Sequence, residues 1–285
     1  MPPPAPRFDA GAIRDYYDRH TAGFLAWGQG GRQGAIRRAV RGPGVATRAD
    51  AFHYVDDRVG DALDTLVTAG DRLHVVDLGC GVGASLCRLA ARCATLTGTG
   101  LTLSPAQAGD AARRIAAAGL GDRVRVVVGD FCAPPALPAD AAWAIEAFAH
   151  APSAARFFAG ASRVVRPGGL LLVCDDFASP DSSRAAEAAR ARVRRGWRLN
   201  TLIPLAEAHA AAAAAGFVLE DATALTPWLE LARPRDRALA VLAAVLDPLP
   251  GAWRRYGPLL GGSALRRALR RGWIGYHLLR FRRTG

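Results

Sequence analysis

The sequence VVDLGCGVGA at positions 75–84 constrains the fold of this 285-residue chain more than any other stretch. Two valines, an aspartate and a leucine lead into glycines at alternate positions, Gly79, Gly81 and Gly83, and the helical pattern SLCRLAARC follows at once. This order predicts a strand, a tight turn and a helix. Glycine suits such a turn because the backbone bends sharply and lies close to a ligand with no Cβ atom between them.

From position 73 onward, short apolar segments alternate with helical patterns, which is typical of a parallel sheet covered by helices on both faces. Strands are expected at 73–78, 94–101, 123–129, 140–148, 169–177, 217–225 and 273–283. Helices are expected at 84–93, 104–118, 153–165 and 204–215, the second of them with Ser104 as N-cap and Pro105 in its first position. Apolar residues at helical spacing also predict helices at 13–25 and 47–66.

The charge of the chain bears on its partners. Its net charge is +12, which admits nucleic acid, anionic lipid or an anionic substrate. All 37 basic residues are Arg, however, and with the long alanine tracts this favours GC-rich coding over selection for a basic surface. No acid follows Asp247, whereas nine arginines lie between Arg254 and Arg283. A solvated face and a basic lid over an anionic or membrane-associated substrate both fit this asymmetry.

Cysteine and histidine usage argues against disulfides and metal. The five cysteines have no CxxC spacing, which favours free thiols in a reducing compartment, and the six histidines form no ligand-spaced pair, so no metal is expected. The first residues, MPPPAP, lack the features of a signal peptide and are expected to be a disordered tail. The apolar run 238–246 is too short to span a bilayer. We therefore expect a soluble, cytoplasmic protein without membrane insertion.

The glycine turn alone leaves its ligand open. The pattern Gly79-x-Gly81-x-x-Ala84 also satisfies the dinucleotide fingerprint in its alanine form. Asp77, however, places a carboxylate at the end of the first strand, where it suits an ammonium group better than a pyrophosphate. The sequence GLTLSPAQ (100–107) closes the second strand without the acid that a dinucleotide ribose would need.

The third strand, VRVVVGDF, ends in Asp130 beside Phe131, which fits the edge and ring of an amino-purine. Together with RPGG (166–169), these motifs resemble the class I S-adenosylmethionine-dependent methyltransferases, in the same order along the chain. The sequence GLTLSxxQ and the GDF-like turn are most similar to the sterol, tocopherol and cyclopropane-fatty-acid branch. The resemblance covers roughly residues 16–225.

This resemblance implies an α/β, Rossmann-like, doubly wound sheet of seven strands whose last strand is antiparallel. It divides the chain into an N-terminal tail and helical cap (1–72), a cofactor-binding core (73–225), an inserted helical lid (226–272) and the final strand (273–285). Asp77 and the glycine turn would bind the methionine part of S-adenosylmethionine, and Asp130 and Phe131 its adenine. The full set of implied cofactor-binding residues is Tyr17, Asp77, Gly79, Cys80, Gly81, Gly83, Thr102, Leu103, Gln107, Asp130 and Phe131.

Two residues at the end of the fourth strand are candidates for acid–base chemistry. Methyl transfer from a sulfonium is mostly a matter of positioning, and a base is needed only when the acceptor loses a proton. The sequence AIEAFAHAP supplies Glu146 and His150, and the resembled branch has a similar pair. Glu146 could remove a proton after methylation of carbon, stabilise a cation, or only organise the site. His150 could deprotonate a hydroxyl or an amine, or make a structural hydrogen bond.

The acceptor is expected to lie against bulky side chains. Asp175 and Asp176 end the fifth strand, and we expect one of them to face the site and the other to face away. Phe177, Trp197 and Trp228 fall in segments expected to line the pocket, although core packing is the alternative for each.

The sequence thus predicts methyl transfer to a small apolar acceptor of specialised metabolism, isoprenoid-like or aromatic, first of all at carbon. Methylation at oxygen or nitrogen is the alternative. A nucleic-acid methyltransferase is disfavoured because IEAF stands where the aminopurine type carries an N/D-P-P-Y motif, and no RNA-binding module is appended. A nicotinamide oxidoreductase rests on the glycine pattern alone. A non-catalytic binding protein and a homodimer both stay open.

Overall fold

The computed structural model describes residues 7–27, 34, 36–66 and 72–285; the predicted N-terminal tail, 1–6, lies outside the described residues. The strands are β1 (Leu73–Leu78), β2 (Leu96–Thr102), β3 (Val124–Val128), β4 (Ala139–Ile145), β5 (Val165–Ala178), β6 (Phe217–Ala224) and β7 (Ile274–Arg283). The helices are α1 (Ala10–Trp27), α2 (Arg48–Asp64), α3 (Ala84–Arg92), α4 (Pro105–Ala117), α5 (Ala154–Val164), α6 (Arg184–Trp197), α7 (Leu205–Ala214), α8 (Pro234–Leu246) and α9 (Ala252–Arg270), with short turns η2 (Phe148–His150) and η3 (Thr226–Trp228).

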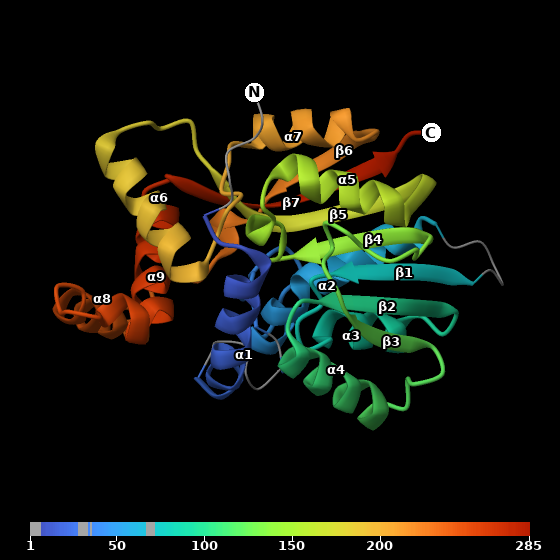
Figure 1. The fold of residues 1–285 in the computed structure, drawn as a ribbon, viewed down its shortest axis with the longest axis horizontal. Coiled ribbons are helices and arrows are strands. Elements are labelled where there is room, and N and C mark those ends of the chain that lie inside the picture. The colour runs from blue at the N-terminus through green and yellow to red at the C-terminus, as the bar shows by residue number, and fades with distance from the viewer. Residues whose placement is uncertain (1–6, 28–33, 35, 67–71) are drawn as a thin grey trace.

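The strands form one seven-stranded sheet in the order β3-β2-β1-β4-β5-β7-β6 (Figure 1). Strands β1 to β5 pair in parallel, and β7 runs antiparallel to both β5 and β6. This confirms the predicted doubly wound α/β sheet with an antiparallel last strand. The strand order reverses between β1 and β4, and in open α/β sheets a ligand binds at such a reversal, beyond the carboxyl ends of the strands.

Helices cover both faces of the sheet, as strand β5 illustrates. Leu171 and Val173 pack on one face in a cluster that includes Phe158 of α5. Leu170 and Leu172 pack on the other face in a cluster that includes side chains of α2 and α3. Because both faces are buried in the middle of the sheet, β4 and the LLLVC segment of β5 are apolar almost throughout, and this is the pattern that predicted a parallel sheet.

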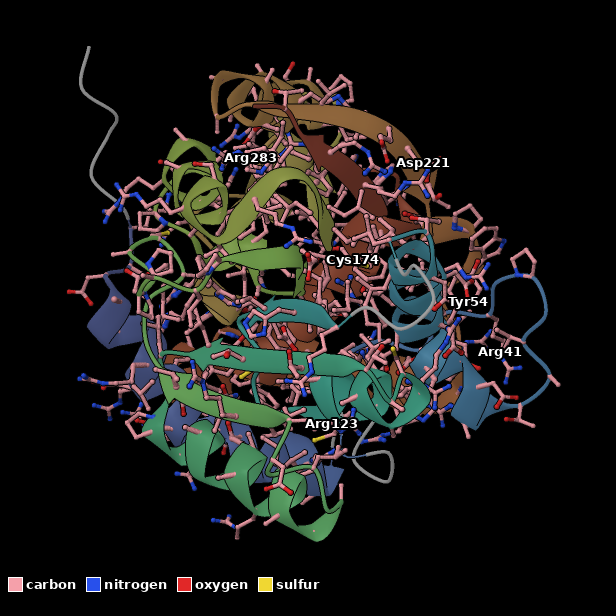
Figure 2. The ribbon with its side chains drawn as sticks, turned by 90° about the vertical axis from the view of Figure 1, so that its right-hand side faces the viewer. Arg41, Tyr54, Arg123, Cys174, Asp221 and Arg283 are labelled. Atoms are coloured by element: carbon pink, nitrogen blue, oxygen red, sulfur yellow. The ribbon has the colours of Figure 1, made fainter. Side chains whose placement is uncertain are left out.

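Local contacts fix the ends of the elements. Ser104 is the N-cap of α4, its side chain accepts from the Gln107 N–H, and Pro105 opens the helix, as predicted. At the start of β3, the guanidinium of Arg123, labelled in Figure 2, donates to the carbonyls of Ala90 and Leu96. These bonds tie β3 to the end of α3 and the start of β2.

A lobe of α6, α8 and α9 lies at one end of the molecule, at the left of Figure 1. Helices α8 and α9 lie between β6 and β7 in the sequence, and we call this pair the lid. No element was predicted at 178–203, where the structure has α6. A Cβ atom at Gly196 of α6 would lie 2.3 Å from Cα of Gly261, so glycine lets α6 and α9 come together. None of the described helices is both long enough and apolar enough to cross a bilayer.

Candidate active site

A cavity of ≈ 510 Å³ lies beyond the carboxyl ends of β1, β2, β4 and β5. Further walls come from α1, the segment 36–39, the end of α6, and the lid. The volume falls within the range of pockets that hold small molecules. The cavity therefore joins the sheet edge, where a cofactor is expected, to the lid, where an acceptor is expected.

The glycine turn forms the wall of the cavity beside β1. Gly79, Gly81 and Gly83 have φ angles of 95°, 52° and 74°, a region that glycine adopts without strain. A Cβ atom at Gly79 would lie 2.5 Å from Cβ of Ala147, whereas one at Gly81 would meet only the Gln107 side chain, at 3.9 Å. Gly79 and Gly81 line the cavity, and Gly83 lies behind them as the N-cap of α3.

Asp77, at the end of β1, also lines the cavity. Asp77 is only 3% exposed, and burial raises the pKa of its carboxyl to about 7. A buried carboxylate needs a cationic partner or it takes up a proton. The donor set at this wall, a carboxylate beside an open glycine turn, thus suits the ammonium and the backbone-like portion of an amino-acid ligand.

The end of β2 is tied to α1 by a chain of hydrogen bonds. Thr102 Oγ1 donates to Gln107 Oε1 at 3.0 Å, and Gln107 Nε2 donates to Thr21 Oγ1 at 3.1 Å. Thr102, Gln107, Leu103 and Cys80 all line the cavity. Thr21 was not predicted, because a threonine inside a helical pattern carries no sequence signal of such a contact.

Of the two residues predicted after β3, Phe131 lines the cavity and packs edge-on against Phe157. Asp130 does not line it. The Asp130 carboxylate accepts instead from the N–H of Cys132 at 2.7 Å and so closes the turn that positions Phe131.

Glu146 follows β4 in the left-handed conformation, with a φ of 53°, which is uncommon for residues other than glycine. Its Oε1 accepts three hydrogen bonds, from the N–H and Nε of Arg38, each at 3.2 Å, and from the Tyr276 hydroxyl at 3.0 Å. Backbone strain of this kind gathers at functional sites, where the surroundings hold it in place. Glu146 also lines the cavity.

Arg38 joins the acidic residues of this wall. Its guanidinium pairs with Glu146, donates to Asp176 Oδ1 at 2.7 Å, and lies 3.9 Å from the centre of the Tyr276 ring. Neither Arg38 nor Tyr276 was predicted as a site residue. The segment around Arg38 has no periodic pattern, and Tyr276 reaches the site only because β7 pairs with β5, so no local signal marks either residue.

Asp175 and Asp176 both line the cavity. The expectation that only one of them faces the site is therefore wrong, because Arg38 lines the cavity on the second face of β5 and pairs there with Asp176. Asp175 accepts from the N–H groups of Ala149 and Asp176, at 3.0 and 2.8 Å. Burial, reinforced by the neighbouring Asp176, raises the pKa of Asp175 to about 7.

His150 and Tyr17 form a hydrogen-bonded pair on the cavity wall. His150 Nδ1 lies 3.2 Å from the carbonyl of Arg198, which can only accept, so we assign the ring proton to Nδ1. Nε2 then accepts from the Tyr17 hydroxyl, 2.7 Å away. Burial lowers the pKa of His150 to about 4, so the ring is neutral at physiological pH. The only free lone pair of the ring, on Nε2, already accepts the hydrogen bond from Tyr17.

The lid side of the cavity is mainly apolar. Trp197 lines it as predicted, and leucines from the end of α6, from the loop before α8 and from both lid helices surround it; they are Leu199, Leu229, Leu231, Leu239, Leu259, Leu265 and Leu269. The predicted pocket residue Phe177 is instead buried in the core, stacked on Phe148. Trp228 is also absent from the lining, because the turn η3 directs it against Tyr54 of α2.

Charged side chains accompany these leucines. Arg233, Arg235, Arg266 and Asp236 line the lid side, and Asp236 accepts from Arg233 Nε at 3.0 Å and from Arg266 at 3.1 Å. Within the described ranges, no group of three or more His, Cys, Asp or Glu side chains is arranged to hold a metal ion.

Comparison with known proteins agrees with this geometry. Residues 75–169 match the methyltransferase domain family. The chain is 36% identical over 130 residues to 24-methylenesterol C-methyltransferase 2 of Oryza sativa, covering 45% of this chain and 34% of that protein. It is 34% identical over 180 residues to 27-O-demethylrifamycin SV methyltransferase of Amycolatopsis mediterranei, covering 62% and 64%. The match thus spans about a third of the sterol enzyme's length and somewhat less than two thirds of the rifamycin enzyme's.

Solved structures resemble the chain over nearly its whole length. The cyclase SpnF has a TM-score of 0.72 at 25% identity, covering 99% of this chain and 98% of its own. Geranyl diphosphate C-methyltransferase of Streptomyces coelicolor has a TM-score of 0.70 at 21% identity, covering 98% and 100%, and shows the same fold. Fold, glycine turn and domain match together support a class I S-adenosylmethionine-dependent methyltransferase. The curated relatives also include aclacinomycin 10-hydroxylase of Streptomyces purpurascens, 40% identical over 111 residues, or 36% of this chain and 28% of that protein.

Proposed function

We propose that this protein transfers a methyl group from S-adenosylmethionine to a carbon atom of a small apolar acceptor, isoprenoid-like or aromatic. One observation carries the proposal. A single cavity brings together Asp77 and the glycine turn, the fixed carboxylate of Glu146, and a leucine-rich lid side. The first would hold the cofactor, the last would hold the acceptor, and Glu146 would serve the chemistry.

The residues of the cofactor side fit S-adenosylmethionine. Asp77 is a buried carboxylate that an ammonium group would match, Gly81 leaves its backbone open, and Gln107 and Phe131 supply an amide and a ring on the same cavity. When bound, the cofactor supplies an electrophilic methyl group on a positively charged sulfur. Tyr17 of α1, hydrogen-bonded to His150, would close this side against water.

Glu146 is the residue we propose for proton transfer or cation stabilisation. Three donors on Oε1 fix the carboxylate in one orientation, so its other oxygen, Oε2, would accept the proton that an alkene or aromatic carbon loses after methylation. The leucines of the lid side would position the acceptor and exclude water from it. Arg38 and Tyr276 act through Glu146 and are positioning residues.

His150 is less suited to act as a base. Its Nε2 accepts from Tyr17, and burial lowers its pKa to about 4, so it would give up a hydrogen bond to take a proton that it binds weakly. This favours carbon over a hydroxyl or amine acceptor activated by His150, and we propose a structural role for the histidine.

A second candidate is a reaction in the same cavity without methyl transfer. It is supported by the likeness to a cyclase at 25% identity over 99% of the chain. The two readings differ in one product, since only methyl transfer converts S-adenosylmethionine to S-adenosylhomocysteine.

The test is to incubate the full chain with methyl-labelled S-adenosylmethionine and a panel of isoprenoid and aromatic acceptors. We expect labelled product in the organic extract, in equal amount to the S-adenosylhomocysteine formed, and formation of both about 10²-fold more slowly in Glu146→Gln. Conversion of an acceptor without label would support the second candidate and overturn the first. Parallel calorimetry with NADH addresses the oxidoreductase reading, and binding of NADH but not of S-adenosylhomocysteine would refute the proposed cofactor.

A further inference from the structure

The outer face of α8 is apolar and exposed. Val241 and Val245 are one helical turn apart and are 67% and 63% exposed. Leu242 lies beside them on the helix and is 46% exposed, and Leu249, in the turn that follows the helix, is 51% exposed. These four belong to the six large apolar side chains that are most exposed in the described part of the chain. A cluster of this kind marks an interaction site more often than scattered exposed residues do. We call these four residues the α8 stripe.

The opposite side of α8 is already in use. Asp236 and Leu239 line the cavity, and Ala243 is buried against Ala252 and Leu260 of α9. The helix thus has one side on the acceptor end of the cavity and the other side pointing outward. In Figure 1, α8 is the outermost element of the α6, α8 and α9 lobe.

Positive charge borders the α8 stripe. Arg237 of α8 and Arg254 and Arg255 at the start of α9 are exposed. The two acids between positions 234 and 255 are both paired with arginines, Asp236 with Arg233 and Arg266, and Asp247 with Arg192 at 2.6 Å. The outward surface therefore combines apolar side chains with arginines, which suits an anionic surface.

We propose that the α8 stripe docks on an anionic membrane surface, and that the lid takes its apolar acceptor from that membrane. Helices that lie in a membrane interface have this composition, with the apolar residues reaching the acyl boundary and the arginines at the head groups. A second copy of this chain is disfavoured as the occupant, because a twofold contact would bring the same arginines together. The delivery of an acceptor rests on the proposed function, whereas membrane docking does not.

Vesicle flotation with the full chain tests docking without any methyl-transfer assay. The probes are vesicles of equal parts phosphatidylcholine and phosphatidylglycerol, and vesicles of phosphatidylcholine alone. We expect the chain to float with the first and not with the second. The double variant Val241→Glu/Val245→Glu should lower the partition coefficient at least tenfold, because it removes apolar burial and adds negative charge. The matched control is Val218→Glu, at a valine that is 55% exposed on β6 and lies outside the α8 stripe; this variant should bind as the unaltered chain does.

Charge is tested separately. Arg237→Gln should weaken binding to the anionic vesicles about fivefold. Equal flotation of the Val241→Glu/Val245→Glu variant and the unaltered chain would overturn the proposal, as would no flotation with anionic vesicles at low salt. Sedimentation that shows a dimer lost in the same double variant would overturn it in favour of a second copy. Both valines are exposed, so the fold should survive, and calorimetry with S-adenosylhomocysteine verifies this; Val241→Ser/Val245→Ser is the milder variant.

Discussion

Asp77→Asn should weaken the binding of S-adenosylhomocysteine and, at the same time, stabilise the free protein at pH 8. Both effects have one cause, which is that Asp77 is buried and its pKa is raised from 3.8 to about 7. The free protein holds this charge at a cost that a bound ammonium group would offset. Asparagine keeps the shape of the side chain but carries no charge, so it removes both the cost and the attraction.

The magnitudes follow from the pKa. The difference between the pKa values of Asp77 in the unfolded and the folded chain corresponds to roughly 4 kcal/mol. This is the free energy by which folding favours the neutral carboxyl over the charged one. Because the folded value is the higher one, the unfolded chain ionises first, and stability falls as the pH rises from about 4 to about 7. Asp77→Asn should therefore raise the melting temperature of the free protein by several degrees at pH 8 and change it little at pH 4.

Binding should change in the opposite direction. The carboxylate is mostly ionised at pH 8 and mostly protonated at pH 6, so affinity for S-adenosylhomocysteine should fall about tenfold between these values. At pH 8, loss of a charged hydrogen bond should cost Asp77→Asn about 1.5–3 kcal/mol, or roughly 10- to 100-fold in affinity.

Calorimetric titration at both pH values, paired with thermal melts of the ligand-free protein, measures these changes. The matched control is Asp175→Asn, which removes another buried carboxyl whose pKa is about 7 on the same cavity, and which should keep the pH dependence contributed by Asp77. Unchanged affinity of Asp77→Asn at pH 8 would refute the reasoning, because the ammonium would then have another partner.

Three further predictions concern the chemistry and the lobe. Glu146→Gln should lower turnover by about 10²-fold while leaving S-adenosylhomocysteine affinity within a few-fold; an unchanged rate excludes proton transfer by this residue. Arg38→Met leaves the carboxylates of Glu146 and Asp176 without their shared cation. The free energy of unfolding, measured by denaturant titration, should therefore drop by about 3 kcal/mol at pH 8 and by less at pH 4. An equal drop at both pH values would show that Arg38 contributes packing and not charge. Gly196→Ala should lower the free energy of unfolding by about 1–3 kcal/mol, because the added Cβ atom pushes α6 away from α9. The control is Gly121→Ala, where a Cβ atom would meet nothing within 4 Å. Equal melting temperatures of the two variants would contradict the close approach of the helices.

Local signals in the sequence were sufficient for the core of the fold. The turn at Gly79 and Gly81 needs glycine for its backbone angles, and Ser104 satisfies an N–H of its own helix, so both are recognisable within a few residues. Asp77 could be placed at the cavity for the same reason, since a residue that ends a parallel strand lies at the ligand edge of the sheet.

Residues that depend on distant pairing could not be predicted in this way. Arg38 reaches Glu146 across 108 positions of the chain, and Tyr276 does so across 130. Phe177 was predicted to line the pocket but does not. Side chains alternate along a strand, so Phe177 lies on the same face of β5 as Asp175, two residues away. At that position, however, Phe148 covers this face of the sheet. Parity predicts which face of the sheet a side chain is on, but not whether that face is open there.

The position of the transferred methyl group tests the central claim most directly. The measurement is a carbon NMR spectrum of the product formed from S-adenosylmethionine with a ¹³C-labelled methyl group and an apolar acceptor that the chain turns over. We predict a labelled methyl signal bonded to carbon, which forms about 10²-fold more slowly when Glu146→Gln replaces the unaltered chain. A label bonded to oxygen or nitrogen, or a converted acceptor without label, would contradict carbon methylation assisted by Glu146.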